Sequence, residues 1–307
     1  MSRLIITFDE SAAGVLKATG LADRVLSFGW RLVWGRLPAP DVLSHEAEID
    51  GRSLAEFGER FDAVELWADP EPNAQLQLVW LLDHLRPHAD VVARLTLRQA
   101  TSTIGNHLPE QWIARRPRAI PVHDDHLQIA SAAWAAWNAP TPGAWFDLLA
   151  QDLSALPQLR NTVTALLEEL PMRATGLGAT QMRMLALLSA GHVHPYDLFP
   201  GHEKPNERRT YGYWEVGELL DGMARCPTPA VSGLAEGPFD DALHDSRERH
   251  ARYRESRLAL TKLGRAILAQ SDDFSRHNPI HRWWGGTELT ARRLWRWDPA
   301  NRKLVAP

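Results

Sequence analysis

Short apolar runs alternate with helix-like stretches through the first hundred residues of the chain. The runs are rich in β-branched and large apolar side chains, which is typical of strands buried on both faces of a sheet. The predicted strands are residues 4–7, 25–28, 32–34, 63–67 and 91–97. The predicted helices between them are residues 12–16, capped by Ser11, then 52–61 and 76–85. This alternation predicts an α/β domain over residues 1–107, with a Rossmann-like, mostly parallel sheet covered by helices.

The strand pattern stops after residue 107, and helical stretches separated by proline-containing turns take its place. The predicted helices are residues 127–137, 145–153 and 159–170. Because this segment has no strands, we expect residues 108–171 to pack on the neighbouring domains or to link them.

The pattern changes again in the last part of the chain, residues 172–307. It predicts helices, a short strand, a further capped helix and closing strands. These elements are a helix at 181–189 capped by Thr180, a helix at 213–223, a strand at 257–260, a helix at 261–268, and strands at 287–290, 294–297 and 303–305. This order is typical of a winged-helix-like α+β domain that ends in a β-hairpin.

Several segments, taken in order, resemble a bacterial family whose members carry an N-terminal domain of unknown function 1835. The segments are residues 6–14, 25–35, 65–82, 176–185, 258–268 and 282–298. The resemblance covers nearly the whole chain and implies the same architecture, but it brings no established reaction. Family members have Gly-Asp-Ser after the first strand, where this chain has Asp9, Glu10 and Ser11. They also have a histidine-bearing acidic stretch where residues 68–73 here contain no histidine, which puts any chemistry of that stretch in doubt.

The composition describes an ordinary globular protein of 307 residues, 44% hydrophobic and 23% charged, long enough for two domains. No apolar run approaches the roughly 18 residues of a membrane-spanning helix, so we expect no membrane association. The sequence reaches an acidic pair by Glu10, which is unlike a signal peptide. The single cysteine, Cys226, excludes an internal disulfide. We therefore expect a cytoplasmic protein, and its oligomeric state stays open.

Polar side chains follow the first predicted strand and the strand at 63–67. Because ligands of open parallel sheets bind beyond the carboxyl ends of the strands, this edge is the predicted ligand site. The candidate ligand-binding residues are Asp9, Glu10, Ser11, Gly14, Asp69, Gln75 and Arg98. Two carboxylates beside the turn would repel a bare phosphate. A sugar-like or amine ligand, or a nucleotide whose phosphate is bridged by a metal, fits better.

The same edge has two further interpretations. Asp9, Asp69, Glu71 and Gln75 supply the oxygen ligands that Mg²⁺ prefers. The simpler interpretation is a helix cap and a proline-rich turn with solvated acids. The chain contains neither G-x-G-x-x-G nor G-x-x-x-x-G-K-[ST], so no cofactor is assigned, and whether the protein is an enzyme stays open.

The positive charge of the chain is concentrated near its end. From Asp245 onward there are 14 Arg and Lys against 7 Asp and Glu, although the whole chain has a net charge of −4. Four tryptophans lie among these arginines, and cations beside flat rings suit phosphates and bases. The candidate face for nucleic acid or another partner is Arg282, Arg292, Arg293 and Arg296. The alternation over 294–297 equally fits packed strands with one solvated face.

Three functions are therefore open. The first is binding of a small polar ligand at the edge of the N-terminal sheet, the second is nucleic-acid-associated regulation, and the third is protein interaction. His192, His194 and His202 share one loop and could bind zinc or nickel if that loop folded back. No H-E-x-x-H motif or cysteine supports such a site, so we predict a polar surface loop without a metal.

Overall fold

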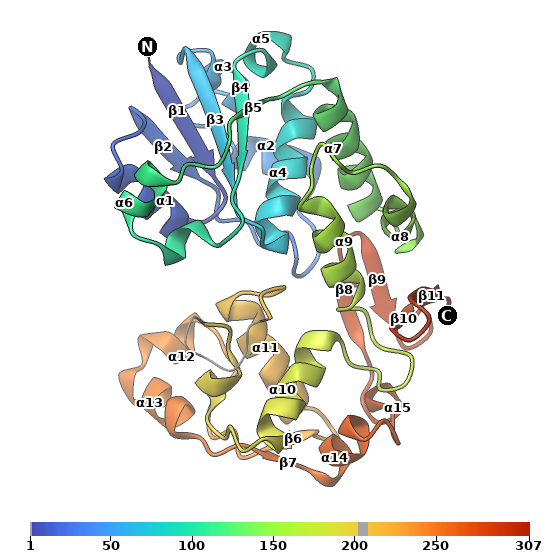
Figure 1. Ribbon diagram of the computed structural model, residues 1–307. Helices are drawn as coiled ribbons and strands as arrows, with labels where there is room; N and C mark the ends of the chain where they lie inside the picture. Colours follow the sequence, from blue (N-terminus) through green and yellow to red (C-terminus); the bar gives the residue numbers. More distant parts are fainter. Residues whose placement is uncertain (1, 202–207) are drawn as a thin grey trace. The chain divides into compact units, whose positions relative to one another are not determined.

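The computed structural model describes residues 2–201 and 208–307 (Figure 1). The chain divides into two compact units. Unit 1 is Met1–Thr164 with Gly285–Thr287, and unit 2 is Ala165–Trp284 with Glu288–Pro307. The predicted helical segment up to residue 164 thus belongs to the same unit as the sheet.

Unit 1 is built on a five-stranded sheet in the order β2-β1-β3-β4-β5. The strands are β1 (Arg3–Thr7), β2 (Arg24–Ser27), β3 (Ala63–Ala68), β4 (Leu95–Gln99) and β5 (Ile120–Pro121). The first four are parallel, and β5 is antiparallel to β4. The predicted α/β class with a mostly parallel sheet is confirmed.

Helices cover both faces of this sheet. One face is covered by α4 (Pro72–Leu85), which lies between the sheet and α7 (Asp124–Trp137) (Figure 1). On the other face, α1 (Glu10–Ala18) packs with η1 (Ile104–Asn106) and α6 (Pro109–Ala114). The remaining helices of this part of the chain are α2 (Pro40–Glu46), α3 (Leu54–Gly58), α5 (Ala89–Val92), α8 (Gly143–Asp147), η2 (Leu148–Ala150) and α9 (Leu159–Leu167). Because α4 is sandwiched, nearly all its side chains are buried, including the glutamines of its first turns.

Four local predictions for unit 1 are wrong. Residues 32–34 form turns and bends, not a strand. The start of the predicted strand at 91–97 belongs to α5, because a β-branched run has no periodicity that separates a helix end from a strand. The strands do not stop at residue 107, since β5 extends the sheet. Finally, Asp9 caps α1 instead of Ser11, its Oδ1 accepting from the N–H of Ala12 at 2.9 Å.

Unit 2 contains helices and three two-stranded sheets. Its helices are α10 (Ala179–Ser189), η3 (Pro195–Leu198), α11 (Tyr213–Ala224), α12 (Asp241–Asp245), α13 (Arg247–Glu255), α14 (Lys262–Leu268) and α15 (Phe274–His277). Its strands are β6 (Val231–Ser232), β7 (Ala259–Leu260), β8 (His281–Trp284), β9 (Thr287–Thr290, which begins at the unit boundary), β10 (Arg296–Asp298) and β11 (Lys303–Val305). The predicted closing hairpin is present as the antiparallel pair β10–β11.

Of the two helix caps predicted in unit 2, one is present and one is not. Thr261 caps α14 as predicted, accepting from the N–H of Gly264 at 3.1 Å. Thr180 does not cap α10, because its hydroxyl donates to buried Glu169 at 2.6 Å and Gly178 is the N-cap residue. The helices α12 and α13 were not predicted.

Within the described residues, no helix is both long enough and apolar enough to cross a bilayer.

The centre of the unit 1 sheet contains a buried ion pair. Glu65 on β3 accepts hydrogen bonds from Arg98 Nε at 2.7 Å and from Trp67 Nε1 at 2.9 Å, and Arg3 Nε lies 3.5 Å from its Oε1. Burial acts to raise the pKa of Glu65, but the hydrogen bonds from Arg98 and Trp67 outweigh it, so the pKa is lowered. The carboxylate thus stays charged inside the sheet layer.

We predict that Glu65→Ala lowers the free energy of unfolding by about 3–5 kcal/mol, because it leaves the Arg98 guanidinium buried without its carboxylate. Urea denaturation measures the loss. Glu59→Ala, at the exposed end of α3, is the matched control and should change stability by less than about 0.5 kcal/mol. Equal stability of the two variants would contradict the role of this ion pair.

Candidate functional site

Three parallel strands end at the same level along one edge of the unit 1 sheet. Thr7, the last residue of β1, is in register with Trp67 of β3, and Trp67 is in register with Arg98 of β4. Asp9 and Asp69 therefore occupy equivalent positions, each two residues beyond that level on neighbouring strands. The chain passes from β1 to β2 on one side and reaches β3 on the other side. The connections thus diverge between β1 and β3, and in open α/β sheets ligands bind at such a switch point.

Asp69 is buried at this switch point, with 1% of its surface exposed. Its Oδ1 accepts from the N–H of Ile104 at 2.5 Å, whereas no described residue hydrogen-bonds to its buried Oδ2. Burial, and secondarily the negative charges of Glu71 and Asp9, raise the pKa of Asp69 to about 7, although the Ile104 N–H opposes the shift. Near neutral pH this carboxyl group can therefore hold or release a proton.

Three amide side chains in the first turns of α4 face the same edge. Gln75 Nε2 donates to the carbonyl of Asp69 at 2.5 Å, and Asn73 Nδ2 donates to the carbonyl of Trp30 at 2.7 Å. Gln77 Nε2 donates to the carbonyls of Trp30 and Phe8 at 3.1 and 3.2 Å. These bonds tie α4 to the segments that follow β1, β2 and β3. They use only the amide N–H groups of the three side chains.

The opposite ends of these amides have no partner in the described part of the chain. In unit 1, the buried side-chain atoms without a hydrogen bond among the described residues are the oxygens of Asn73, Gln75, Gln77 and Thr7, Oδ2 of Asp69, and both amide atoms of Gln99. Buried polar atoms are almost always paired in folded proteins, so each exception calls for an explanation. Here the exceptions gather at the carboxyl ends of β1, β3 and β4, and most of them are acceptors.

The segment after β4 closes over the start of α1. Thr103 Oγ1 donates to Glu71 at 2.6 Å, and Trp112 Nε1 donates to the carbonyl of Ile104 at 3.1 Å. A Cβ at Gly105 would lie 2.7 Å from Cβ of Ser11, so only glycine allows this close approach. The hydrogen bond from Ile104 to Asp69 is therefore held by packing on both of its sides.

The structure brings only some of the predicted ligand-binding residues together. Asp69 and Gln75 meet through a direct hydrogen bond, and Asp9 is close enough for its charge to affect Asp69. Glu10, Ser11 and Gly14 lie on the exposed surface of α1. Gly14 has open space where a Cβ would be, so no close approach requires a glycine there.

Arg98 is not brought to the other predicted residues. Its guanidinium donates to Glu65 and to the carbonyl of Pro117 at 2.6 Å, and it lies over the ring of Trp67. An arginine inside β4 can extend along the sheet face, and the buried carboxylate of Glu65 attracts it there. The sequence pattern places residues in strands but does not show this pairing across strands.

The four C-terminal arginines have unequal environments. Arg282 donates to the carbonyl of Glu169 at 2.6 Å, and Arg296 pairs with Asp273 at 2.9 Å. Arg292 and Arg293 are exposed. Two of the four thus serve the internal structure of unit 2.

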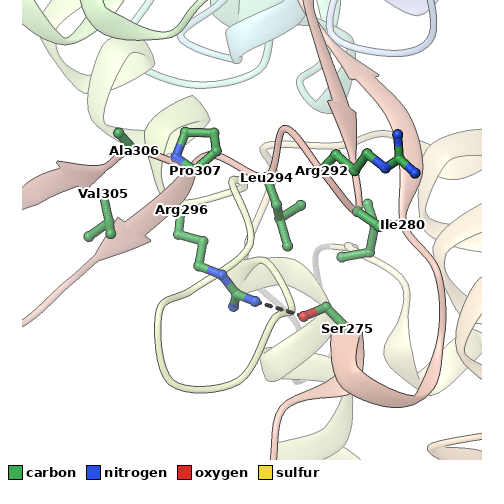
Figure 2. A pocket seen from close by; sticks show the side chains of 9 residues that line it. Ser275, Ile280, Arg292, Leu294, Arg296, Val305, Ala306 and Pro307 are labelled. Carbon is green, nitrogen blue, oxygen red and sulfur yellow. Dashed lines mark hydrogen bonds between the residues drawn. The ribbon is translucent and has the colours of Figure 1, made fainter.

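A shallow cavity of about 340 Å³ in unit 2 is lined by Arg292 and Arg296 together with apolar side chains such as Leu294 and Ile280. Figure 2 shows that Arg296 turns to Ser275, whose Oγ is 2.7 Å away, whereas the guanidinium of Arg292 points away from that residue. The two arginines therefore do not converge on one point.

The predicted histidine loop is described only in part. His194 is the N-cap residue of η3, with its backbone N–H donating to Asp197 at 3.1 Å, and His192 is half-buried. His202 lies outside the described residues. Over the described ranges 2–201 and 208–307, no three His, Cys, Asp or Glu side chains form a group that could hold a metal ion.

The polar cluster also contains four residues that were not predicted, Thr7, Asn73, Gln77 and Gln99. One signal was available, because Gln75 and Gln77 interrupt an otherwise apolar run in α4. A helix that is apolar on all sides is buried, so polar side chains within it mark buried polar contacts. Thr7 and Gln99 carry no such signal, since a polar residue at a strand end is ordinary.

The raised pKa of Asp69 predicts a pH-dependent stability. A carboxyl group whose pKa is higher in the folded state than its unfolded value of about 3.9 binds protons more tightly when folded. Its contribution to stability is therefore greatest below pH 4 and falls as the pH rises through 7. In Asp69→Asn this dependence is absent, because the amide keeps an acceptor for Ile104 and does not ionise.

We therefore expect the stability of Asp69→Asn relative to the wild type to increase by about 2–3 kcal/mol between pH 5 and pH 8. Urea denaturation at the two pH values gives the difference, in which the other titrating groups cancel. Asp41→Asn, at an exposed position of α2, should give a constant difference. A constant difference for Asp69→Asn as well would show that this carboxyl is already ionised at pH 5.

Comparison with known proteins adds no family to this description. No family model matches the chain, and no curated protein matches it. The resemblance to the family with the domain of unknown function 1835 therefore stays a prediction.

Proposed function

We propose that the protein binds a small polar ligand, nucleotide-like or sugar-like, at the switch point of the unit 1 sheet. The observation that carries the proposal is the cluster of buried, unpartnered acceptor atoms around Asp69. Leaving a buried polar group unpaired costs about 1–3 kcal/mol. Six such oxygens at one sheet edge are best explained by a ligand that supplies their hydrogen bonds.

The chemistry of the cluster narrows the class of ligand. Its open atoms are mainly oxygens that accept hydrogen bonds, so the ligand must bring donors, and hydroxyl and amine groups are the common ones. Asp9, Glu71 and Asp69 place negative charge at the same edge, which disfavours a bare phosphate. A sugar or the ribose of a nucleotide meets both conditions.

Asp69 is the residue with the capacity for chemistry. A carboxyl group with a pKa near neutral pH can accept a proton from a ligand hydroxyl or return it, which is the requirement for general acid–base catalysis. Its Oδ1 is fixed by Ile104, so Oδ2 is the atom that would meet the ligand. We therefore propose ligand binding, and Asp69 is the residue that a reaction at this site would use as its acid or base.

The alternatives have weaker support. A nucleic-acid or acidic protein partner would depend on Arg292 and Arg293, since Arg282 and Arg296 are paired within unit 2. The order of α10, α11, the β6–β7 pair and α14 agrees with a winged-helix-like interpretation of unit 2, which stays a proposal. Among the described residues of unit 2, no contact favours either partner.

We expect at least one nucleoside, sugar or nucleotide–Mg²⁺ mixture to raise the melting temperature of the wild-type protein by several degrees, because a ligand that binds only the folded state stabilises it. Thermal-shift measurements with each compound and with MgCl₂ alone identify the ligand class. Asp69→Asn and Gln75→Leu should each remove most of the shift.

The matched control, Asp41→Asn, should keep the full shift. A shift that survives in both Asp69→Asn and Gln75→Leu would place the ligand elsewhere. The absence of a shift with every compound would contradict the proposed ligand class.

A further inference from the structure

Unit 2 contains a continuous chain of hydrogen bonds through four side chains from four different elements. Tyr196 of η3 and Tyr213 of α11 have their hydroxyl oxygens 2.7 Å apart. At one end, Tyr196 is 2.7 Å from Nε2 of His250 on α13. At the other end, Tyr213 is 2.8 Å from Nε2 of His244 on α12, whose Nδ1 is 2.8 Å from the carbonyl of Asp240.

Aromatic packing holds these side chains in place. The ring of Phe239 lies 5.2 Å from the ring of Tyr213 and 4.8 Å from that of His244, and Tyr253 packs against Tyr196 at 5.9 Å. Phe239 reaches this position because it packs directly on Gly217 of α11, where a Cβ would collide with the ring. The four polar side chains therefore belong to a packed aromatic cluster.

The direction in which each hydrogen bond is donated follows from the end of the series at Asp240. The carbonyl of Asp240 can only accept, so Nδ1 of His244 carries hydrogen, and in the neutral ring Nε2 must be the bare acceptor. Tyr213 then donates its single hydrogen to His244. The bond between the two tyrosines must use the hydrogen of Tyr196, and the last bond must use the Nε2–H of His250.

The pKa shifts of Tyr196 and His250 agree with a series of hydrogen bonds between uncharged side chains. Burial, followed by hydrogen bonding to Tyr213, raises the pKa of Tyr196, so its hydroxyl keeps its hydrogen. Burial, with the nearby His244 and Arg254, lowers the pKa of His250, which favours the neutral ring. Each bond in the chain then has one donor and one acceptor.

We propose that Tyr196, Tyr213, His244 and His250 form an acid–base site in unit 2 for a ligand that carries a hydroxyl or ammonium group. Tyr213 is 40% exposed, and its oxygen donates once and accepts once, which leaves one lone pair for an outside donor. A ligand that meets Tyr213 must therefore bring the hydrogen. The residues of this site all belong to unit 2, and the proposal does not depend on the ligand proposed for unit 1.

This arrangement supports a proton transfer from the ligand through Tyr213 to His244. A ligand O–H bond breaks as its hydrogen moves to the oxygen of Tyr213, and the original Tyr213 hydrogen moves to Nε2 of His244. The products are a ligand alkoxide and an imidazolium at His244, whose Nδ1–H stays bonded to Asp240. Tyr213 touches the ligand, and His244 receives the proton.

The test is to determine the imidazole tautomers in the whole protein by ¹⁵N NMR at a pH where both rings are neutral. The directed chain requires opposite tautomers, Nδ1–H for His244 and Nε2–H for His250. In Tyr213→Phe the hydroxyl of Tyr196 is no longer committed to Tyr213, so the His250 population should shift toward Nδ1–H, while His244 keeps its bond to Asp240. Tyr196→Phe should likewise release His250, and it serves as a second variant if Tyr213→Phe does not fold.

Tyr253→Phe is the matched control, because this neighbouring buried tyrosine has a hydroxyl with no described hydrogen-bond partner. It should leave both tautomers unchanged. The same tautomer in both wild-type rings would overturn the proposal, as would a His250 tautomer that does not respond to either Tyr213→Phe or Tyr196→Phe.

Discussion

The arrangement of unit 1 depends on one buried hydrogen bond, from the N–H of Ile104 to the carboxyl group of Asp69. It joins the end of β3 to the segment that follows β4, and that segment packs on the start of α1 through Gly105. Burying the carboxyl group carries an energetic cost that one N–H bond offsets only in part, which is why its pKa rises toward neutrality. The fold thus keeps a proton-exchanging group at the point where the strand connections diverge.

Two buried carboxyl groups, one on β3 and one directly after it, show how surroundings decide the role of a residue. Glu65 has a nearby arginine, a tryptophan N–H and a lowered pKa, so it is a structural charge within the sheet. Asp69, four residues later, has acidic neighbours and an oxygen without a described partner. The first carboxylate is saturated with protein contacts, whereas the second has hydrogen-bonding capacity that the fold does not use.

The sequence predicted the mostly parallel sheet and its carboxyl edge, because apolar strand runs and the polar residues that follow them are local signals. It placed Asp69 and Gln75 at one site for the same reason. It did not predict the switch point between β1 and β3, the pairing of Arg98 with Glu65 or the tyrosine–histidine chain of unit 2. These depend on strand order and on side chains from several elements meeting in space, and Tyr196 and His250 are 54 residues apart in the chain.

The central claim is that Asp69 carries an exchangeable proton near neutral pH, and a direct titration of its side-chain carboxyl carbon by ¹³C NMR tests it. Asp69→Asn identifies the resonance. The structure predicts a midpoint at about pH 7, with burial as the main cause. A midpoint near the ordinary aspartate value of about 3.9 would contradict the account.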